Sequence, residues 1–524
     1  MTLDKLNFAG YNQFFIFSCR IILLNRIRPY APTLALLCSG MLFALGFAPF
    51  HWSACLYCGL LLFFYFIQNS ATPFKHGFCF GIGVGLIGIS WVYICIYEYG
   101  HLPKPLAAFF TLVFICYIAL FYAGFAYLNQ LTCKKIPPWL WPFSIAACWC
   151  CFEWIRSHLF GGFPWLMLGF SALKSPLEKL LPWFGIYGPS FVMCFALACL
   201  VYACQRKPRY SIVGVLCFIL PQYLPLSTSN ENQQTMVHAA MVQGNTTMQD
   251  KWDADKFWGQ FGYYLNEIHQ LLKPMQVVIL PEAAISVPST FIHRELEQLD
   301  KIAHLKKSAV LIGIPKPAQE HNSYYNAMLG LGEAKGFYHK QQLVVFGELI
   351  PEFLYPLFKF LDMPLVSTIP GEKNQPLIEV FNQPIASLIC YELAYPDILR
   401  QQLPKAQWIV SLSDDGWFGH SSAIYQHLEM AQTLSYMSHR PQIFVNNNGL
   451  SSIINAQGQI IQQIRPWHQG HSSASFTSEN NTVPWMFWGD LPILCLCLII
   501  LIICASLQIV NATTGRSLSL KVDI

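Results

Sequence analysis

The chain has 524 residues, of which 54% are hydrophobic and 11% are charged, and its formal net charge is +4. A wholly soluble protein of this length would carry far more charge, so the composition excludes that class and predicts an integral membrane protein. The small positive charge forms no basic stripe with interleaved aromatic residues, which argues against a nucleic-acid partner.

Eight mainly apolar stretches are long enough to cross about 30 Å of hydrocarbon as helices. They lie near 31–49, 52–69, 77–98, 106–129, 138–155, 183–204, 210–226 and 485–508. The first 30 residues do not have the pattern of a cleavable signal peptide, because Asp4 and Lys5 precede an apolar run that Arg20 interrupts. We therefore expect 1–30 to remain as a cytoplasmic segment before an uncleaved first span.

Lysine and arginine are distributed unevenly between the loops that join these stretches. With the N-terminus inside, the cytoplasmic segments carry twelve of them and the opposite short loops only four. Cytoplasmic loops are enriched in basic residues. The pattern predicts seven spans within 31–226, an eighth at 484–510 and a cytoplasmic tail at 511–524. Both termini would be cytoplasmic, and the polar region 227–483 would lie outside the cytoplasm.

The composition changes abruptly after the seventh stretch. Short apolar segments rich in β-branched residues predict strands at 236–242, 277–280, 309–314, 385–389, 408–412 and 443–445. Helical periodicity lies between them, for example at Leu296, Leu299 and Ala303. Alternating strands and helices indicate a layered α/β domain whose functional residues lie on loops at the strand ends.

Cysteine placement singles out one residue of this region. Of 19 cysteines, only Cys390 lies within 227–483. A domain with one thiol cannot form an internal disulfide, so Cys390 is either an inert core residue or a reactive nucleophile. Its position favours the nucleophile, because it ends a strand-like run and is followed at once by Tyr391 and Glu392.

Two further strand ends carry charged residues, Glu282 after Ile279-Leu-Pro and Lys340 after Tyr338-His. A thiol with its ordinary pKa of about 8.5 is mostly protonated at neutral pH, so a nucleophile needs a base or a neighbouring cation. Glu282 can accept the proton, and Lys340 can stabilise the thiolate and the oxygen of an attacked carbonyl. The alternative is a purely structural ion pair, which is a costly arrangement when buried.

The ordered set of motifs resembles a known family. Leu280-Pro-Glu282, Tyr338-His-Lys340 and Cys390-Tyr-Glu392 are similar to the Glu-Lys-Cys triad motifs of the nitrilase superfamily, whose domains fold as an αββα sandwich. A helical membrane domain before this region and one span after it resemble the apolipoprotein N-acyltransferases, the membrane-embedded branch. Further motifs of this resemblance are Val242-Gln-Gly-Asn245 with Lys251-Trp252, Phe346-Gly-Glu348, Trp417-Phe-Gly419, Asn447-Asn-Gly449 and Gly162-Phe-Pro-Trp165.

The resemblance implies a two-step acyl transfer in a bacterial inner membrane, with the α/β domain in the periplasm. The acyl donor would be a phospholipid, typically the sn-1 chain of phosphatidylethanolamine, and the acceptor the diacylglyceryl-cysteine of an apolipoprotein. Cys390 would form an acyl-thioester that the acceptor amine then attacks, with Glu282 moving protons in both steps. No metal or cofactor is required, because the ester and then the thioester carry the free energy. Apart from the acyl donor and the acceptor, we expect membrane lipid as the only partner. We expect the protein to be a monomer.

The resemblance also implies roles for residues around the triad. Glu348 would support the triad lysine, and Trp252, Tyr391 and Asn326 would line or brace the pocket. Glu392 would fix the turn after the nucleophile. For Glu348 and Glu392, ordinary solvated or capping roles are the open alternative.

Two positions depart from the family pattern. Val345 stands where proline is common, and Asp414 stands where asparagine is common. Neither belongs to the triad, and both leave the shape of the adjoining loops open.

Two other features have two interpretations each. The apolar run 353–361 is either a mobile flap that guides acyl chains or packed core. The motif 162–165 either lines a lipid entrance or anchors the chain at the interface. Glu153 and Arg156, at i and i+3 on a helix, pair to lower the cost of their burial. The histidines His420, His427 and His439 follow no ligand spacing, so we expect no metal site.

Two rival functions share part of this evidence. A membrane-tethered amidase or hydrolase of the nitrilase type would use the same triad but pass its acyl group to water. A non-enzymatic transport or assembly protein would leave the triad motifs unexplained, and few ionisable residues lie in the apolar stretches to mark a transport path.

Overall fold

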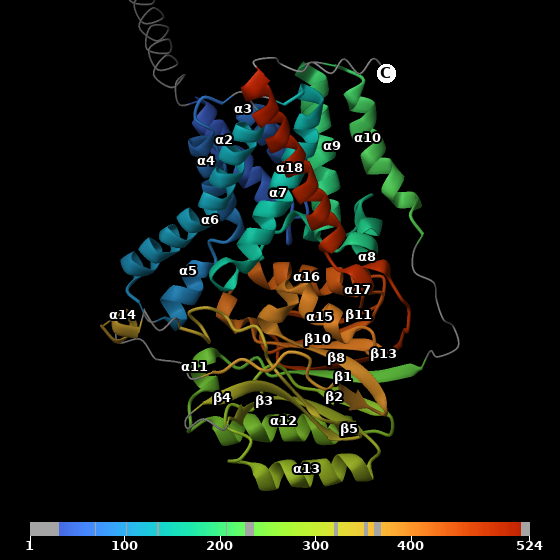
Figure 1. The fold of residues 1–524 in the computed structure, drawn as a ribbon. Helices are drawn as coiled ribbons and strands as arrows, with labels where there is room; N and C mark the ends of the chain where they lie inside the picture. Colours follow the sequence, from blue (N-terminus) through green and yellow to red (C-terminus); the bar gives the residue numbers. More distant parts are fainter. Residues whose placement is uncertain are drawn as a thin grey trace, which may run out of the picture.

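The computed structural model describes residues 31–68, 70–100, 102–133, 136–205, 207–225, 235–318, 323–350, 355–360 and 368–514. A bundle of helices lies above an α/β domain built of stacked layers (Figure 1). The predictions for 1–30, for parts of 353–361 and for most of the tail 511–524 lie outside the described residues.

Each of the eight predicted apolar stretches contains a helix. The bundle consists of α2 (Ala31–Ala44), α3 (Ser53–Gln68), α4 (Pro73–Gly88), α5 (Val92–Ile94), α6 (Lys104–Cys133), α7 (Trp141–His158), α8 (Leu181–Phe184), α9 (Tyr187–Gln205), α10 (Tyr210–Ile219) and α18 (Leu491–Thr514). Among the described residues, α6, α9 and α18 are long and apolar enough to cross a membrane alone, and α4 with the segment after it forms a fourth candidate bent by 67°. Since α2, α3 and α10 are shorter, the number of eight spans stays a prediction.

Glycines bring the first bundle helices into close contact. A Cβ atom at Gly40 would lie 2.0 Å from the carbonyl oxygen of Phe80, and one at Gly83 would lie 2.0 Å from that of Leu37. Gly77 approaches the backbone of α6 in the same way. Lipid tails give apolar helices no hydrophobic reason to associate, so small residues that allow close backbone packing hold such bundles together.

The α/β domain contains two sheets. The first has the strand order β13-β1-β2-β3-β4-β6, and the second has the order β12-β11-β10-β9-β8-β7-β5. The strands are β1 (Met236–Gln243), β2 (Gln276–Ile279), β3 (Ala309–Pro317), β4 (Tyr324–Gly332), β5 (Ala334–Lys335), β6 (Phe337–His339), β7 (Ile378–Val380), β8 (Gln383–Ile389), β9 (Trp408–Ser413), β10 (Gln442–Asn446), β11 (Ser451–Ile454), β12 (Ile460–Ile464) and β13 (Gly470–Thr477).

Helices cover both outer faces of the paired sheets. The helices of this domain are α11 (Met248–Lys251), α12 (Phe257–Leu271), α13 (His293–Leu305), α14 (Tyr355–Phe360), α15 (Pro396–Gln402), α16 (Ala423–Ser438) and α17 (Pro484–Trp488). Helices α12 and α13 cover the first sheet, and α15 and α16 lie between the second sheet and the bundle (Figure 1). This arrangement confirms the predicted αββα sandwich.

The six predicted strands correspond to β1, β2, β3, β8, β9 and β10. The others were missed because they lack continuous apolar runs. Strand β13, for example, is Gly470-His-Ser-Ser-Ala-Ser-Phe-Thr477, yet it pairs antiparallel with β1 along eight residues. This segment forms a strand because its backbone pairs with β1, although its side-chain pattern does not predict one.

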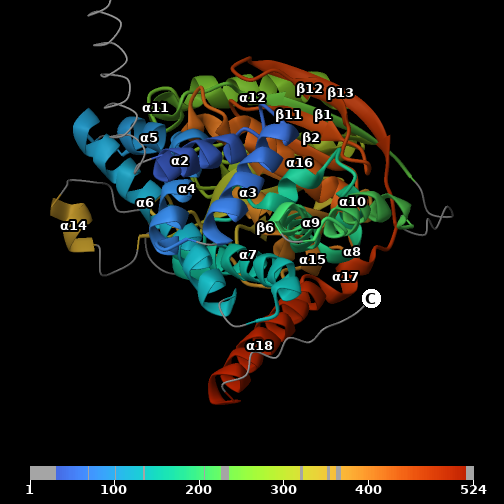
Figure 2. The same ribbon diagram turned by 90° about the horizontal axis from the view of Figure 1, so that it is seen from above.

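The α16 layer joins the two parts of the molecule. Helix α16 is buried over almost its whole length, since the second sheet and the bundle cover it from both sides. One apolar cluster contains Trp165 of the bundle together with Leu428 and Leu434 of α16. Seen from above, α18 lies at the rim and leans away from the bundle (Figure 2). Only 22% of its most apolar stretch of 18 residues is buried. Helix α14 lies at the outer edge of the molecule in both views, outside the packed core.

The close contact at Gly83 predicts a stability loss. Gly83→Ala would place a methyl group against the backbone of α2, and overpacking of this kind costs about 1–3 kcal/mol. We expect a melting temperature several degrees lower in detergent. Gly262→Ala in α12 is the matched control, because nothing lies within 4 Å of its Cβ position. Equal melting temperatures for both variants would contradict the close packing of α2 and α4.

Candidate active site

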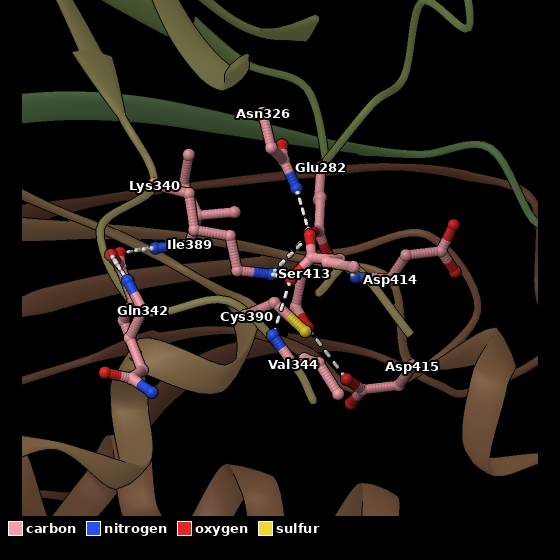
Figure 3. A network of polar contacts seen from close by, with 12 residues as sticks. Glu282, Asn326, Lys340, Gln342, Val344, Ile389, Cys390, Ser413, Asp414 and Asp415 are labelled. Carbon is pink, nitrogen blue, oxygen red and sulfur yellow. Dashed lines mark hydrogen bonds and ion pairs between the residues drawn. The ribbon is translucent and has the colours of Figure 1, made fainter. Parts of the chain in front are cut away.

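The three predicted triad residues lie together between the two sheets, each at the end of a strand. Glu282 follows β2, Lys340 follows β6 and Cys390 follows β8 (Figure 3). The Lys340 Nζ atom lies 3.2 Å from Glu282 Oε1. The three side chains are buried, with exposed fractions of 6%, 1% and 7%. Strand ends from both sheets meet here, so residues 108 positions apart in sequence become neighbours.

Cys390 has a strained backbone conformation. Its φ angle is +52°, in the left-handed region that residues with a side chain rarely adopt. Such strain persists only where the surroundings over-determine it, and it is common at reactive sites. Two contacts restrain the turn. The Ile389 amide donates to Glu392 Oε2 at 2.7 Å, and His427 Nε2 lies 3.1 Å from the Cys390 carbonyl oxygen.

The charged neighbours of the Cys390 thiol have opposite effects on its pKa. Burial, followed by the nearby Glu282 carboxyl, raises the pKa of the Cys390 thiol well above its usual range, while Lys340 lowers it. For Lys340, burial lowers the pKa, but Glu282 and Glu348 outweigh it and raise the pKa well above its usual range. At neutral pH the lysine is therefore a cation and the thiol holds its proton until a base removes it.

Glu348 and Asn326 complete the surroundings of the lysine. Glu348 Oε2 lies 2.8 Å from Lys340 Nζ. The side-chain amide of Asn326 donates to Glu282 Oε1 at 2.7 Å and to Glu348 Oε1 at 3.0 Å, so one side chain orients both carboxylates. Both residues lie where they could support the triad, which is the role that the sequence predicts.

Glu392 ties the nucleophile turn to the loop after the lysine. It is fully buried and accepts hydrogen bonds from the Tyr338 hydroxyl at 3.0 Å, the Gln341 amide at 2.6 Å, the Gln342 amide at 3.2 Å and the Ile389 amide. Burial raises its pKa to about 7, against these hydrogen bonds, which lower it. The contacts exclude an ordinary solvated role. Because Glu392 accepts from the Ile389 amide at the start of the short helix Cys390–Ala394, it caps this helix and braces the turn at the same time.

Comparisons with known proteins identify the family. The model "Apolipoprotein N-acyltransferase N-terminal domain" matches residues 39–200, and "Carbon-nitrogen hydrolase" matches 238–480. An apolipoprotein N-acyltransferase from Coxiella burnetii is 31% identical over 480 residues, which cover 89% of this chain and 98% of the relative. One from Azotobacter vinelandii is 31% identical, with 90% and 95% covered. The chain belongs to the apolipoprotein N-acyltransferase family. The resemblance inferred from the motifs is confirmed.

The bundle loop at Gly161 and Gly162 contacts the residues that follow Cys390. The Tyr391 hydroxyl donates to the Gly162 carbonyl oxygen at 2.9 Å, and the Tyr395 hydroxyl donates to that of Gly161 at 2.7 Å. Val345, where the family commonly has proline, packs against Gly161, whose Cβ would lie 2.4 Å from the valine side chain. The loop 161–165 thus contacts the α/β domain, and both interpretations of this motif stay predictions.

Glu153 and Arg156 shape this loop. The Leu168 amide donates to Glu153 Oε1 at 2.7 Å, and Arg156 donates to the Trp165 carbonyl oxygen at 2.7 Å. The sequence predicts that the two side chains pair with each other. Each binds backbone of the segment 165–168 instead, because amides and carbonyls inside the bundle also need partners.

Sequence reasoning missed a buried ion pair beside the triad. Lys251 Nζ contacts the Asp414 carboxylate and donates to the Glu282 carbonyl oxygen at 2.8 Å. The Asp414 amide donates to Glu282 Oε2 at 2.9 Å. Together these contacts hold Glu282 by its backbone and its side chain. The neighbouring Trp252 is 56% exposed and lies outside this network, so its place in the pocket stays a prediction.

A second missed group lies beneath the nucleophile. The Ser413 hydroxyl donates to Asp415 Oδ1 at 2.8 Å, and His427 Nδ1 lies 2.8 Å from the same oxygen. The sequence offers no signal for this contact of His427, because Asp415 lies on a different element. In the part of the chain that the structure describes, no cluster of three or more His, Cys, Asp and Glu side chains could hold a metal ion.

The buried ion pair of Lys251 and Asp414 predicts that removing one charged partner costs more stability than removing both. Asp414→Asn would leave the Lys251 ammonium buried without a counter-charge, which typically costs about 3–5 kcal/mol. We expect a large fall in melting temperature, partly recovered in the double variant Lys251→Met/Asp414→Asn. Asp250→Asn, which breaks the exposed pair with Lys256, is the control and should change little. A double variant no more stable than Asp414→Asn would contradict this account.

Glu392 predicts a pH dependence of stability. Because its pKa rises from 4.5 to about 7 on folding, the folded chain keeps a proton that the unfolded chain releases between these values. Its contribution is therefore fully present below pH 4.5 and is lost as the pH rises through 7. Glu392→Gln does not titrate, so only the wild type loses stability over this range, and the variant is the less stable of the two at low pH. Its deficit in melting temperature should shrink between pH 5 and 8, and a constant deficit would contradict the raised pKa.

Proposed function

We propose that this chain transfers a fatty acyl group from a phospholipid to the N-terminal diacylglyceryl-cysteine of apolipoproteins, through an acyl-thioester on Cys390. The relatives that span nearly the whole chain carry the name of this activity, which supports the acceptor class. The single observation that supports the chemistry is the buried contact of Glu282 and Lys340 beside the strained Cys390 turn.

In the first half-reaction, Glu282 takes the thiol proton and the Cys390 sulfur attacks the ester carbonyl of the phospholipid. Lys340 offsets the negative charge that develops on the carbonyl oxygen, an electrostatic effect that is large in a dry site. The C–S bond forms and the C–O bond breaks. Glu282 returns the proton to the leaving oxygen, so lysophospholipid departs and the thioester remains.

In the second half-reaction, Glu282 accepts a proton from the α-ammonium of the apolipoprotein. The free amine attacks the thioester carbonyl, again beside Lys340. The C–N bond forms, the C–S bond breaks, and the departing sulfur takes the proton on Glu282, which restores the Cys390 thiol. The nitrogen releases its second proton to solvent as the amide forms. One carboxyl can serve both halves because each half returns it to its starting state.

Contacts with the bundle support a lipid donor over a soluble amide. Gln342, two residues after Lys340, donates to the Gly161 carbonyl oxygen at 3.2 Å, and Tyr391, next to Cys390, binds Gly162. Residues next to Lys340 and Cys390 thus contact a loop that joins apolar helices. A lipid could deliver its ester there while its chains stay among those helices, whereas a soluble substrate would need no such contact.

The topology belongs to the same proposal. We place seven spans within 31–226 and an eighth at 484–510 in the bacterial inner membrane, with both termini cytoplasmic. The catalytic domain 227–483 would then lie in the periplasm, where apolipoprotein acceptors would reach it. A monomer is sufficient, since one chain provides the triad and the bundle.

Intact-protein mass spectrometry after incubation with a defined phospholipid tests the thioester. We expect a gain of one acyl chain that hydroxylamine removes and that a diacylglyceryl-cysteine peptide discharges. Cys390→Ala should carry none, and Glu282→Gln should acquire it at least about a hundredfold more slowly, the usual size of a lost general base. Cys58→Ser, at an exposed position in α3, is the matched control and should behave as wild type.

The remaining outcomes separate the rivals. Consumption of phospholipid or of a soluble amide through Cys390 without transfer to the peptide would favour a tethered hydrolase. An adduct that survives in Cys390→Ala, or the absence of both adduct and turnover, would overturn the assignment of the nucleophile.

A further inference from the structure

Two buried groups beneath the nucleophile take no part in the reaction derived above. Asp415 follows β9 and His427 lies in α16, and their side chains are 0% and 1% exposed. Figure 3 shows Asp415 beside Cys390, with Ser413 between them. His427 contacts Asp415 with one ring nitrogen and the Cys390 carbonyl with the other.

The hydrogen-bond inventory limits where protons can be. A carbonyl oxygen only accepts, so His427 Nε2 must carry a hydrogen that it donates to Cys390. The other nitrogen, Nδ1, lies 2.8 Å from Asp415 Oδ1, which is hydrogen-bonding distance. One more proton must therefore lie between these two atoms, on the ring or on the carboxyl. In both cases the pair has zero net charge.

This neutrality matters because of the position of Asp415. Cys390 faces the charged groups Glu282, Lys340 and Asp415, and both carboxyls disfavour its thiolate while Lys340 favours it. An uncompensated Asp415 would add a second negative charge next to the sulfur. Among the residues that the structure describes, His427 forms an ion pair with Asp415 alone, and the rings of Trp165, Phe418 and Phe444 pack around it.

We propose that His427 and Asp415 form a proton-sharing pair of zero net charge that holds the Cys390 carbonyl and prevents Asp415 from opposing the thiolate. The pair acts through Cys390, so both are positioning residues, and the inference rests on the proposed role of Cys390 as nucleophile. The hydrogen bond to the carbonyl also helps to maintain the strained φ of +52°.

Three variants distinguish charge from packing. His427→Gln keeps a donor for the Cys390 carbonyl but removes the shared proton, so Asp415 becomes an uncompensated carboxylate. Asp415→Asn leaves a neutral amide that donates to a neutral imidazole, and the net charge stays zero. The double variant His427→Gln/Asp415→Asn is also neutral. His439→Gln, which changes a buried histidine just beyond the other end of α16, is the matched control.

The measurement is the rate at which iodoacetamide alkylates Cys390 between pH 7 and 10, read from the Cys390 peptide by mass spectrometry in the full-length protein. A neighbouring carboxylate shifts a pKa by about 1–3 units, so His427→Gln should react at least about tenfold more slowly at each pH. Asp415→Asn and His439→Gln should stay within about threefold of wild type. The double variant should recover most of the rate that His427→Gln loses.

A structural role would give the opposite pattern. If the pair only packed the core, the double variant would be no faster than His427→Gln, and that result would overturn the proposal. Equal rates for His427→Gln and wild type would overturn it as well, as would wild-type Cys390 that resists alkylation throughout this pH range. Melting temperatures of the four variants confirm that each is folded at the assay temperature.

The test needs no lipid, so it can fail separately from the proposed function. Recovery in the double variant without any acyl adduct in wild type would retain the charge-balancing pair and reject the acyltransferase chemistry. With the function intact, acyl-thioester formation should follow the same order as alkylation, slowest in His427→Gln and recovered in the double variant.

Discussion

The structure depends on a buried ammonium, Lys340, that two carboxylates compensate. Placing charge between two packed sheets is costly unless every charged group finds a partner. Glu282 and Glu348 provide the counter-charges, and Asn326 orients both of them. The ammonium stays charged because these neighbours outweigh its burial, so a positive charge is held in place next to Cys390.

The same constraint extends around the nucleophile. Lys251 with Asp414, and His427 with Asp415, place two more compensated pairs within the network. Each pair holds backbone as well as charge, since Lys251 binds the Glu282 carbonyl and His427 approaches that of Cys390. The network thus combines two requirements in the same contacts. It keeps a strained turn in place, and it limits the negative charge near the sulfur.

The bundle takes part in this arrangement and does not serve as an anchor alone. Helix α16 is shared between the catalytic domain and the bundle, and Trp165 of the bundle donates to Gln426, beside His427, at 2.6 Å. The loop at Gly161 and Gly162 accepts hydrogen bonds from Tyr391 and Tyr395, which both follow Cys390. A change in the bundle would therefore reach Cys390 through short, direct contacts.

The sequence by itself determined the membrane character and the layered α/β class, and it singled out the three residues Glu282, Lys340 and Cys390 that the structure brings together. Apolar length, strand-like runs and charged residues at strand ends are local signals, and the family motifs gave them an order. The strand β13, the role of Asp414 and the pair of Asp415 with His427 were decided only by the tertiary structure. Strand β13 has no apolar run, and Lys251 lies 163 positions from Asp414, so no local pattern reveals either contact. Pairing of distant backbone and the neutralisation of buried charge depend on which groups folding brings together.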